Sequence, residues 1–134
     1  MKKASSGFTL IELIVVLVIL GILAAVAIPQ FIDLTDEAAQ EAVNAVAGQI
    51  SSASALNAAQ DIAYTAGVST DTPTAVANCT DGSSLLQQGL PSGYSITAGA
   101  VGDKASASCT LTRSGGAAAY GDKTATFTII GVVN

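Results

Sequence analysis

Hydrophobic residues are distributed very unevenly along this chain. The run at residues 8–28 is almost entirely apolar and contains a single charged residue, Glu12. As an α-helix, a run of this length spans roughly 31 Å, close to the hydrocarbon thickness of a bilayer. Lys2 and Lys3 precede the run, and the next basic residue is Lys104. The pattern therefore predicts a membrane-spanning helix with a cytoplasmic N-terminal tail and the rest of the chain outside.

Beyond Pro29, apolar residues recur at steps of three and four as far as Leu56. This spacing is the period of an amphipathic helix, and the many alanines in the segment favour a helix as well. An interior proline kinks a helix. We therefore expect one long helix from about residue 8 to about residue 58, bent near Pro29, whose C-terminal half packs under a sheet.

The remaining sequence predicts a small globular head. The segment at 59–93 is rich in small and polar residues, which indicates an irregular connector with a short helix at 83–88. Alternating, threonine-rich segments then predict antiparallel strands at 94–98, 106–112 and 124–133. We expect an α+β fold in which a long N-terminal helix, with an apolar part at 8–29 and an amphipathic part at 30–58, packs on a small antiparallel sheet in a head at 59–134.

The apolar run has three interpretations. A secretory signal peptide cut after Ala25 or Ala27 would normally have a shorter apolar core. A plain membrane anchor leaves Glu12 unexplained, because a charge at the centre of a span costs about 2.5–3.5 kcal/mol. In the third interpretation the chain is cut between Gly7 and Phe8. The new α-amino group of Phe8 then lies one turn from Glu12, which can neutralise it or the amine of a neighbouring copy.

The segment Gly7-Phe8-Thr9-Leu10-Ile11-Glu12-Leu13, with its short lysine-bearing leader and an apolar run that closes at Pro29, strongly resembles a type IV prepilin. The resemblance covers about the first 40 residues and implies the pilin fold. It also implies that residues 1–7 are a leader removed by a prepilin peptidase, that Phe8 becomes N-methylated, and that Glu12 pairs with the N-terminus of a neighbouring subunit during assembly.

The same resemblance implies partners and a location. The partners are further copies of the chain in a helical homopolymer, the prepilin peptidase/N-methyltransferase, and an assembly platform in the inner membrane. The chain would lie in that membrane, with its head outside the cytoplasm, before it enters an extracellular filament. Gly21 and Pro29 would bound a helix stretch that loosens in the filament. Close helix packing at Gly21 and a simple boundary at Pro29 are the alternatives.

The chain has two cysteines, Cys79 and Cys109. If the head lies outside the cytoplasm, disulfides form and persist there, and two cysteines allow one intramolecular pairing. Closing a loop of this length would stabilise the fold by roughly 3–4 kcal/mol. Two free thiols or an intermolecular bridge are the alternatives. The position of the pair resembles that of the mannose-sensitive haemagglutinin type of pilin.

Composition removes several classes of function. The chain has no histidine, and five basic residues stand against ten acidic ones. No histidine-based catalytic set or histidine metal ligand is therefore available, and nucleic acid is not an expected partner. We expect no catalytic residue, metal or cofactor. The favoured function is a structural subunit of a type IV pilus serving adhesion or surface motility. The alternatives are a pseudopilin of a type II secretion system, or a membrane-anchored extracytoplasmic protein of other function.

Overall fold

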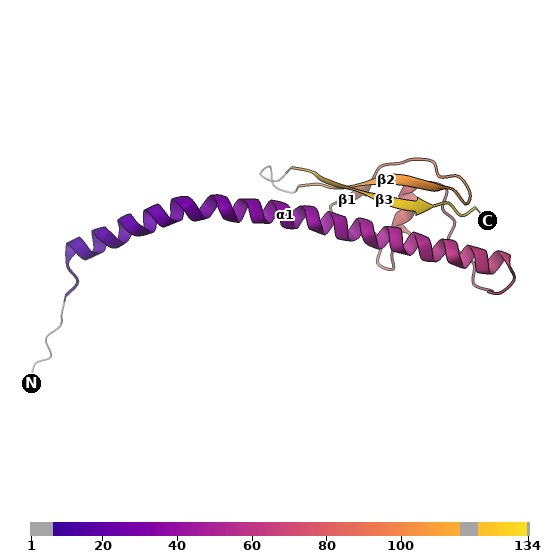
Figure 1. Cartoon of the computed structure of the whole chain (residues 1–134), viewed down its shortest axis with the longest axis horizontal. Helices are drawn as coiled ribbons and strands as arrows, with labels where there is room; N and C mark the ends of the chain where they lie inside the picture. The colour runs from indigo at the N-terminus through magenta and orange to yellow at the C-terminus, as the bar shows by residue number, and fades with distance from the viewer. Residues whose placement is uncertain (1–6, 116–120, 134) are drawn as a thin grey trace, which may run out of the picture. The chain divides into compact units, whose positions relative to one another are not determined.

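The computed structural model describes residues 7–115 and 121–133, except for the side chains of 28–33. The chain divides into two compact units, Met1–Glu37 and Ala38–Asn134. A single long helix, α1 (Leu10–Thr65), runs through both units (Figure 1). The second unit adds the 3-10 helix η1 (Cys79–Ser83) and the strands β1 (Tyr94–Ile96), β2 (Ser106–Arg113) and β3 (Lys123–Ile130). The predicted α+β fold is thus confirmed.

Helix α1 is helical through Pro29 and continues seven residues past the predicted end at residue 58. The bend near Pro29 stays a prediction. The helix ends where Gly67 adopts a left-handed conformation, with φ of 70°. There the backbone N–H of Gly67 donates to Tyr64 O (3.0 Å), and that of Val68 donates to Ala63 O (2.9 Å). These two bonds form a Schellman motif, which satisfies carbonyls that the helix end would otherwise leave unpaired.

One face of α1 in the second unit is buried along six positions spaced by four and three residues. The first three are apolar and the last three are polar: Val43, Ala47, Ile50, Ser54, Asn57 and Asp61. The spacing keeps them on one stripe of the helix. The apolar period in the sequence ends at Leu56, which is exposed, whereas the buried stripe continues through polar residues to Asp61. The packed part of the helix is therefore longer than the apolar pattern indicates, and the predicted end came too early.

The three strands form an antiparallel sheet in the order β1-β2-β3. All three predicted strands are confirmed: β1 and β2 begin where predicted, and the other strand ends differ from the predicted ones by one to three residues. Alternate residues of β2 and β3 point into the core, where Cys109 pairs in register with Phe127 and Leu111 with Ala125. Val43, Ala47 and Ile50 of α1 belong to the same buried cluster. The head therefore has one small core between the helix and the inner face of the sheet.

The connector contains η1 at Cys79–Ser83, and the short helix predicted at 83–88 is wrong. Asn78 caps η1: its Oδ1 accepts from Thr80 N at 3.2 Å, while Asp81 Oδ2 accepts from Asn78 N at 2.9 Å. This reciprocal capping box fixes where the turn begins. Gly82 is buried, and a Cβ there would lie 3.0 Å from Ile50 Cγ2. The short helix of the connector therefore lies at Cys79–Ser83, before the predicted segment at 83–88.

The disulfide between Cys79 and Cys109 is present, with a Cα–Cα distance of 5.7 Å. Both cysteines are buried in the core cluster. The bond joins the start of η1 to the middle of β2, so it ties the irregular connector to the sheet. The predicted intramolecular pairing is confirmed.

Side chains of α1 cover part of the outer edge of β3. Ser51 Oγ accepts from Thr128 N (3.1 Å), and Ser54 Oγ accepts from Ile130 N (2.8 Å). Gln40 Nε2 donates to Thr124 O (2.8 Å). Exposed edge strands are sites of unwanted pairing, and covering them with another element prevents it. The polar residues on α1 are therefore part of the packing between helix and sheet.

Asn57 makes a reciprocal contact with the connector. Its Oδ1 accepts from Thr74 N and its Nδ2 donates to Thr74 O, both at 2.8 Å. Replacing Asn57 by alanine leaves both backbone groups without this partner. We expect Asn57→Ala to lower the free energy of unfolding by about 1–3 kcal/mol. Denaturant unfolding of the full chain in detergent micelles measures this loss. The exposed Asn44→Ala is the control, and equal stability of the two variants would contradict the assigned role.

Candidate functional site

The start of α1 brings together the residues expected to carry processing and assembly. Gly7, Phe8 and Thr9 precede the helix and have no regular secondary structure. The side chain of Phe8 is 81% exposed. The Gly7–Phe8 peptide bond therefore lies in a non-helical stretch just before Leu10, where the helix begins. The other residues of the predicted leader lie outside the described part of the chain.

Glu12 is held by the first turn of its own helix. Its Oε2 accepts from Thr9 N at 2.9 Å and from Thr9 Oγ1 at 2.8 Å. Glu12 N in turn donates to Thr9 Oγ1 at 3.4 Å. This is a capping box, in which a threonine N-cap and a glutamate three residues later satisfy backbone donors at the helix start. The carboxylate also lies where the helix dipole favours negative charge.

The second oxygen of this carboxylate is available to another donor. Both contacts from Thr9 go to Oε2, and among the described residues no hydrogen bond reaches Glu12 Oε1. Apolar side chains surround the carboxylate and line a shallow cavity of about 370 Å³ with it: Phe8, Ile11, Val15 and Val16. A charge on such a surface is costly to bury without a further partner. The site can therefore accept one more donor, and a cationic one would bind best.

The rest of the apolar segment is exposed in the isolated chain. Residues Leu10–Ala27 have a mean hydropathy of 3.1 and are long and apolar enough to cross a membrane. None of this stretch is buried within the chain itself. Exposed apolar surface of this extent marks contact with lipid or with other proteins. We therefore expect lipid or another protein molecule to contact this segment, because a single copy of the chain leaves it exposed.

Gly21 lies inside the exposed apolar helix. A Cβ built on Gly21 meets no atom within 4 Å. No contact among the residues that the structure describes therefore requires the absence of a side chain there. Its predicted roles, in helix loosening or in close packing against another helix, both depend on events outside the single copy. Those roles, and that of Pro29, stay predictions.

Sequence reasoning missed the role of Thr9. The signal was present, because threonine followed three residues later by glutamate is the pattern of a capping box. The negative charge of Glu12 within an apolar run drew attention to a partner in another molecule. The structure adds a partner within the same turn. Among the described residues, no group of three or more cysteine, aspartate or glutamate side chains could hold a metal ion.

Comparison with known proteins identifies one sequence motif and several similar proteins. Residues 2–28 match the prokaryotic N-terminal methylation motif. The chain is 54% identical over 56 residues to the type IV narrow pilus major component PilA5 of Thermus thermophilus, which covers 42% of this chain and 48% of that protein. It is 47% identical over 74 residues to a fimbrial protein of Pseudomonas aeruginosa, which covers 53% of this chain and 44% of that protein.

A type II secretion relative is also similar. The chain is 57% identical over 37 residues to the type II secretion system core protein G of Pseudomonas aeruginosa, covering 28% of this chain and 26% of that protein. No solved structure matches the chain significantly. The chain spans less than half the length of the first relatives it matches. The N-terminal methylation motif and a pilin-like α+β fold are therefore what the sequence and the structure establish together.

Removing the Thr9 hydroxyl tests the capping box. Thr9→Val keeps the size of the side chain but removes the contacts of the hydroxyl to Glu12 Oε2 and Glu12 N, while the backbone N–H of residue 9 can still donate to Oε2. Loss of an N-cap costs about 1 kcal/mol, which corresponds to about fivefold faster opening of the first turn. Amide hydrogen exchange at Glu12 and Leu13, measured by NMR on the full chain in micelles, reports this opening. Thr9→Ser keeps the hydroxyl and is the matched control, and equal exchange rates in the two variants would refute the assignment.

Proposed function

We propose that this protein is the structural subunit of an extracellular type IV pilus and has no catalytic role. One observation carries the proposal. An apolar helix, exposed along its length, begins with a carboxylate that its own chain only half satisfies. The match of residues 2–28 to the methylation motif and the pilus and fimbrial names of similar proteins support it.

Processing would complete the site at Glu12. Cleavage between Gly7 and Phe8 creates an α-amino group that is cationic at neutral pH. Glu12 Oε1 accepts from this group, in the same copy or in a neighbouring one, while Oε2 stays on Thr9. N-methylation of Phe8 leaves the amine cationic and so keeps the pairing. The pairing favours a position among other helices over lipid, because it neutralises the charge within an apolar environment.

The second unit also presents a surface suited to contact between copies. Between residues 42 and 65, α1 contains a single charged residue, Asp61, and it is buried. Outside the buried stripe the helix exposes apolar residues such as Leu56 and Ile62, 72% and 68% exposed. Because this part of the helix surface is uncharged, two copies would not repel each other along it. It supports packing of the second units beside one another once the apolar helices have assembled.

The proposal includes the route of the subunit. The chain waits in the inner membrane as a single span with its head outside the cytoplasm, and a prepilin peptidase/N-methyltransferase processes it. An assembly platform in that membrane then adds it to the filament, which serves adhesion or surface motility. The Cys79–Cys109 loop supports the mannose-sensitive haemagglutinin type of pilin as the subclass.

A pseudopilin of a type II secretion system is the second candidate. The similarity to core protein G favours it, because 37 residues of this chain are 57% identical to that protein. Both candidates use the same membrane span and the same glutamate. They differ in whether a filament extends from the cell surface, which microscopy can decide.

The first test identifies the filament and its N-terminus. We expect electron microscopy to find surface filaments in cells that express the chain and none in cells that lack it. Mass spectrometry of sheared filaments should give a subunit that begins at N-methylated Phe8. Subunits that begin after Ala25 or Ala27 would contradict the proposal. Processed protein without surface filaments would favour the pseudopilin.

The second test concerns the charge of Glu12. Glu12→Gln keeps the shape of the side chain and its contacts to Thr9 possible, but it removes the charge that meets the Phe8 amine. Losing one partner of a buried ion pair costs about 3–5 kcal/mol, so filament yield should fall more than tenfold while cleavage continues. Immunoblots of sheared and cell-bound fractions measure both. The exposed Glu41→Gln removes an equal charge as a control, and equal yields from the two variants would refute the pairing.

A further inference from the structure

Thr126 lies on the edge of β3 and, unlike its neighbours on that edge, makes no hydrogen bond with any side chain of α1 that the structure describes. Thr128 N and Ile130 N donate to side chains of α1 and not to β2. Because hydrogen-bonded and non-hydrogen-bonded pairs alternate in an antiparallel ladder, the backbone groups of Thr124, Thr126, Thr128 and Ile130 all point away from β2. Side chains of α1 pair with Thr124 O, Thr128 N and Ile130 N. Thr126 falls on the side of this alternation that faces away from β2, so its N–H and C=O take no part in the ladder, and among the described residues no turn or side-chain hydrogen bond reaches them either.

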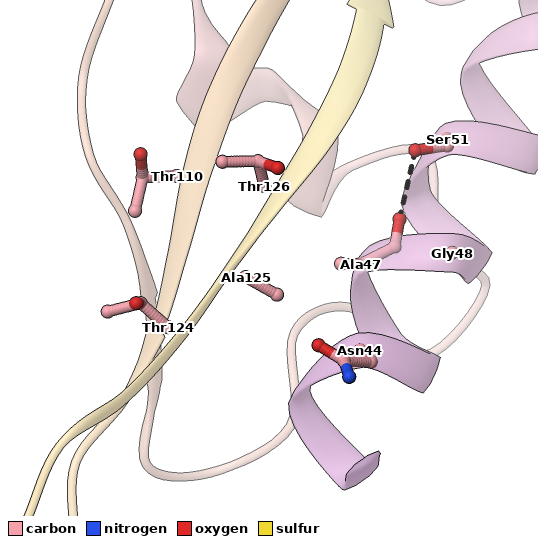
Figure 2. A pocket seen from close by; sticks show the side chains of 8 residues that line it. All are labelled: Asn44, Ala47, Gly48, Ser51, Thr110, Thr124, Ala125 and Thr126. Carbon is pink, nitrogen blue, oxygen red and sulfur yellow. Dashed lines mark hydrogen bonds between the residues drawn. The ribbon is translucent and has the colours of Figure 1, made fainter. Parts of the chain in front are cut away.

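A cleft opens at this position. Its volume is about 580 Å³, and it lies between α1 and the edge of β3 (Figure 2). Gly48 lies on the helix side, where a Cβ would meet no atom within 4 Å. The side chains of Asn44, Ser51 and Thr124 border the space. The residues that line it are all uncharged, so the cleft suits a neutral ligand with hydrogen-bonding groups.

The unpaired groups define the chemistry of that ligand. A donor and an acceptor side by side on one extended residue are complemented by an acceptor and a donor in one plane, which is what a carboxamide offers. The molecule contains this arrangement once already, where the Asn57 carboxamide binds the N–H and the C=O of Thr74 at 2.8 Å each. Thr126 presents the same two groups to the cleft.

Exposed glutamines gather elsewhere on the same unit. Gln49, Gln87 and Gln88 line a second groove, of about 330 Å³, and all three are exposed. We call these three residues the glutamine patch. Gln49 follows Asn44 by five positions, so it lies about 140° around α1 from it. The patch and the Thr126 cleft therefore lie on different flanks of the helix, and one copy cannot fill its own cleft from its own patch.

Resting on the proposed function, we propose that the Thr126 cleft of one copy receives a carboxamide from the glutamine patch of the next copy. Residues 82–102, which include Gln87 and Gln88, contain no charged residue, so an uncharged loop meets an uncharged cleft. Two different surfaces that complement each other form a heterologous contact, which repeats without closing and builds helical filaments. The contact would set how the second units stack.

Photo-cross-linking in assembled filaments tests this contact. A benzophenone amino acid at Thr124, on the rim of the cleft, is activated in sheared filaments of the full-length chain. We expect a cross-linked dimer in which position 124 is joined to the segment around Gln87 and Gln88 of another copy. Mass spectrometry of the dimer identifies the joined segment.

Matched variants make the test specific. Gly48→Gln places a carboxamide of the same copy in the cleft, and Gln87→Ala with Gln88→Ala removes it from the neighbour. Each should lower the dimer yield about tenfold, as expected for the loss of two hydrogen bonds. Gly48→Ala favours the helix equally well but leaves the cleft open, so its dimer yield should match the wild type.

The outcomes are separable from those of the proposed function. Filaments without a cross-link, with a cross-link to another segment, or with a cross-link to a foreign molecule overturn the contact and leave the pilus subunit intact. Equal dimer yields from Gly48→Gln and Gly48→Ala also overturn it. If the chain forms no filaments at all, both the proposed function and this contact fall.

Discussion

The placement of one carboxylate at the head of an exposed apolar helix constrains the rest of this molecule. The charge of Glu12 is stabilised there because Thr9 donates two hydrogen bonds to one of its oxygens and because the helix dipole favours a negative charge at this end. The other oxygen has no hydrogen bond among the described residues, and the carboxylate shares its cavity with apolar side chains. A cation would pair with it most strongly in an environment from which water is excluded. Under the proposed function, a bundle of helices with free amino ends would satisfy this oxygen better than lipid does, and the chain would leave the membrane for an assembly of its own copies.

In the second unit, the helix packs on a sheet of only three strands, and the apolar core between them is small. The helix does this with a stripe that changes from apolar to polar along its length, from Val43 to Asp61. Its hydroxyls and amides bind the backbone of β3 and of the connector, and the disulfide adds a covalent tie. Few aromatic residues are needed because hydrogen bonds to backbone groups replace part of the apolar contact.

The sequence predicted what depends on local pattern and missed what depends on tertiary register. The apolar run, the three strands and the cysteine pair carry their own signals, and all were found. The end of α1 was placed too early because Ser54, Asn57 and Asp61 are buried through hydrogen bonds and packing that no hydrophobic period reveals. The 3-10 helix was misplaced because its start depends on the Asn78 and Asp81 cap. The gap at Thr126 depends on which backbone groups of β3 the side chains of α1 happen to reach.

Two kinds of contact would then divide the work of assembly between the two units. The proposed pairing at Glu12 would be strong in an apolar environment but would carry little directional information, because an ammonium can approach a carboxylate from several sides. The proposed amide pairing at Thr126 would be weaker, but its two parallel hydrogen bonds in one plane would fix the orientation. A filament held by the first alone would tolerate rotation between subunits. The contact at Thr126, repeated in every copy, would select one rotation between neighbouring subunits. Polar contacts of this kind fix the orientation of partners more than they add affinity.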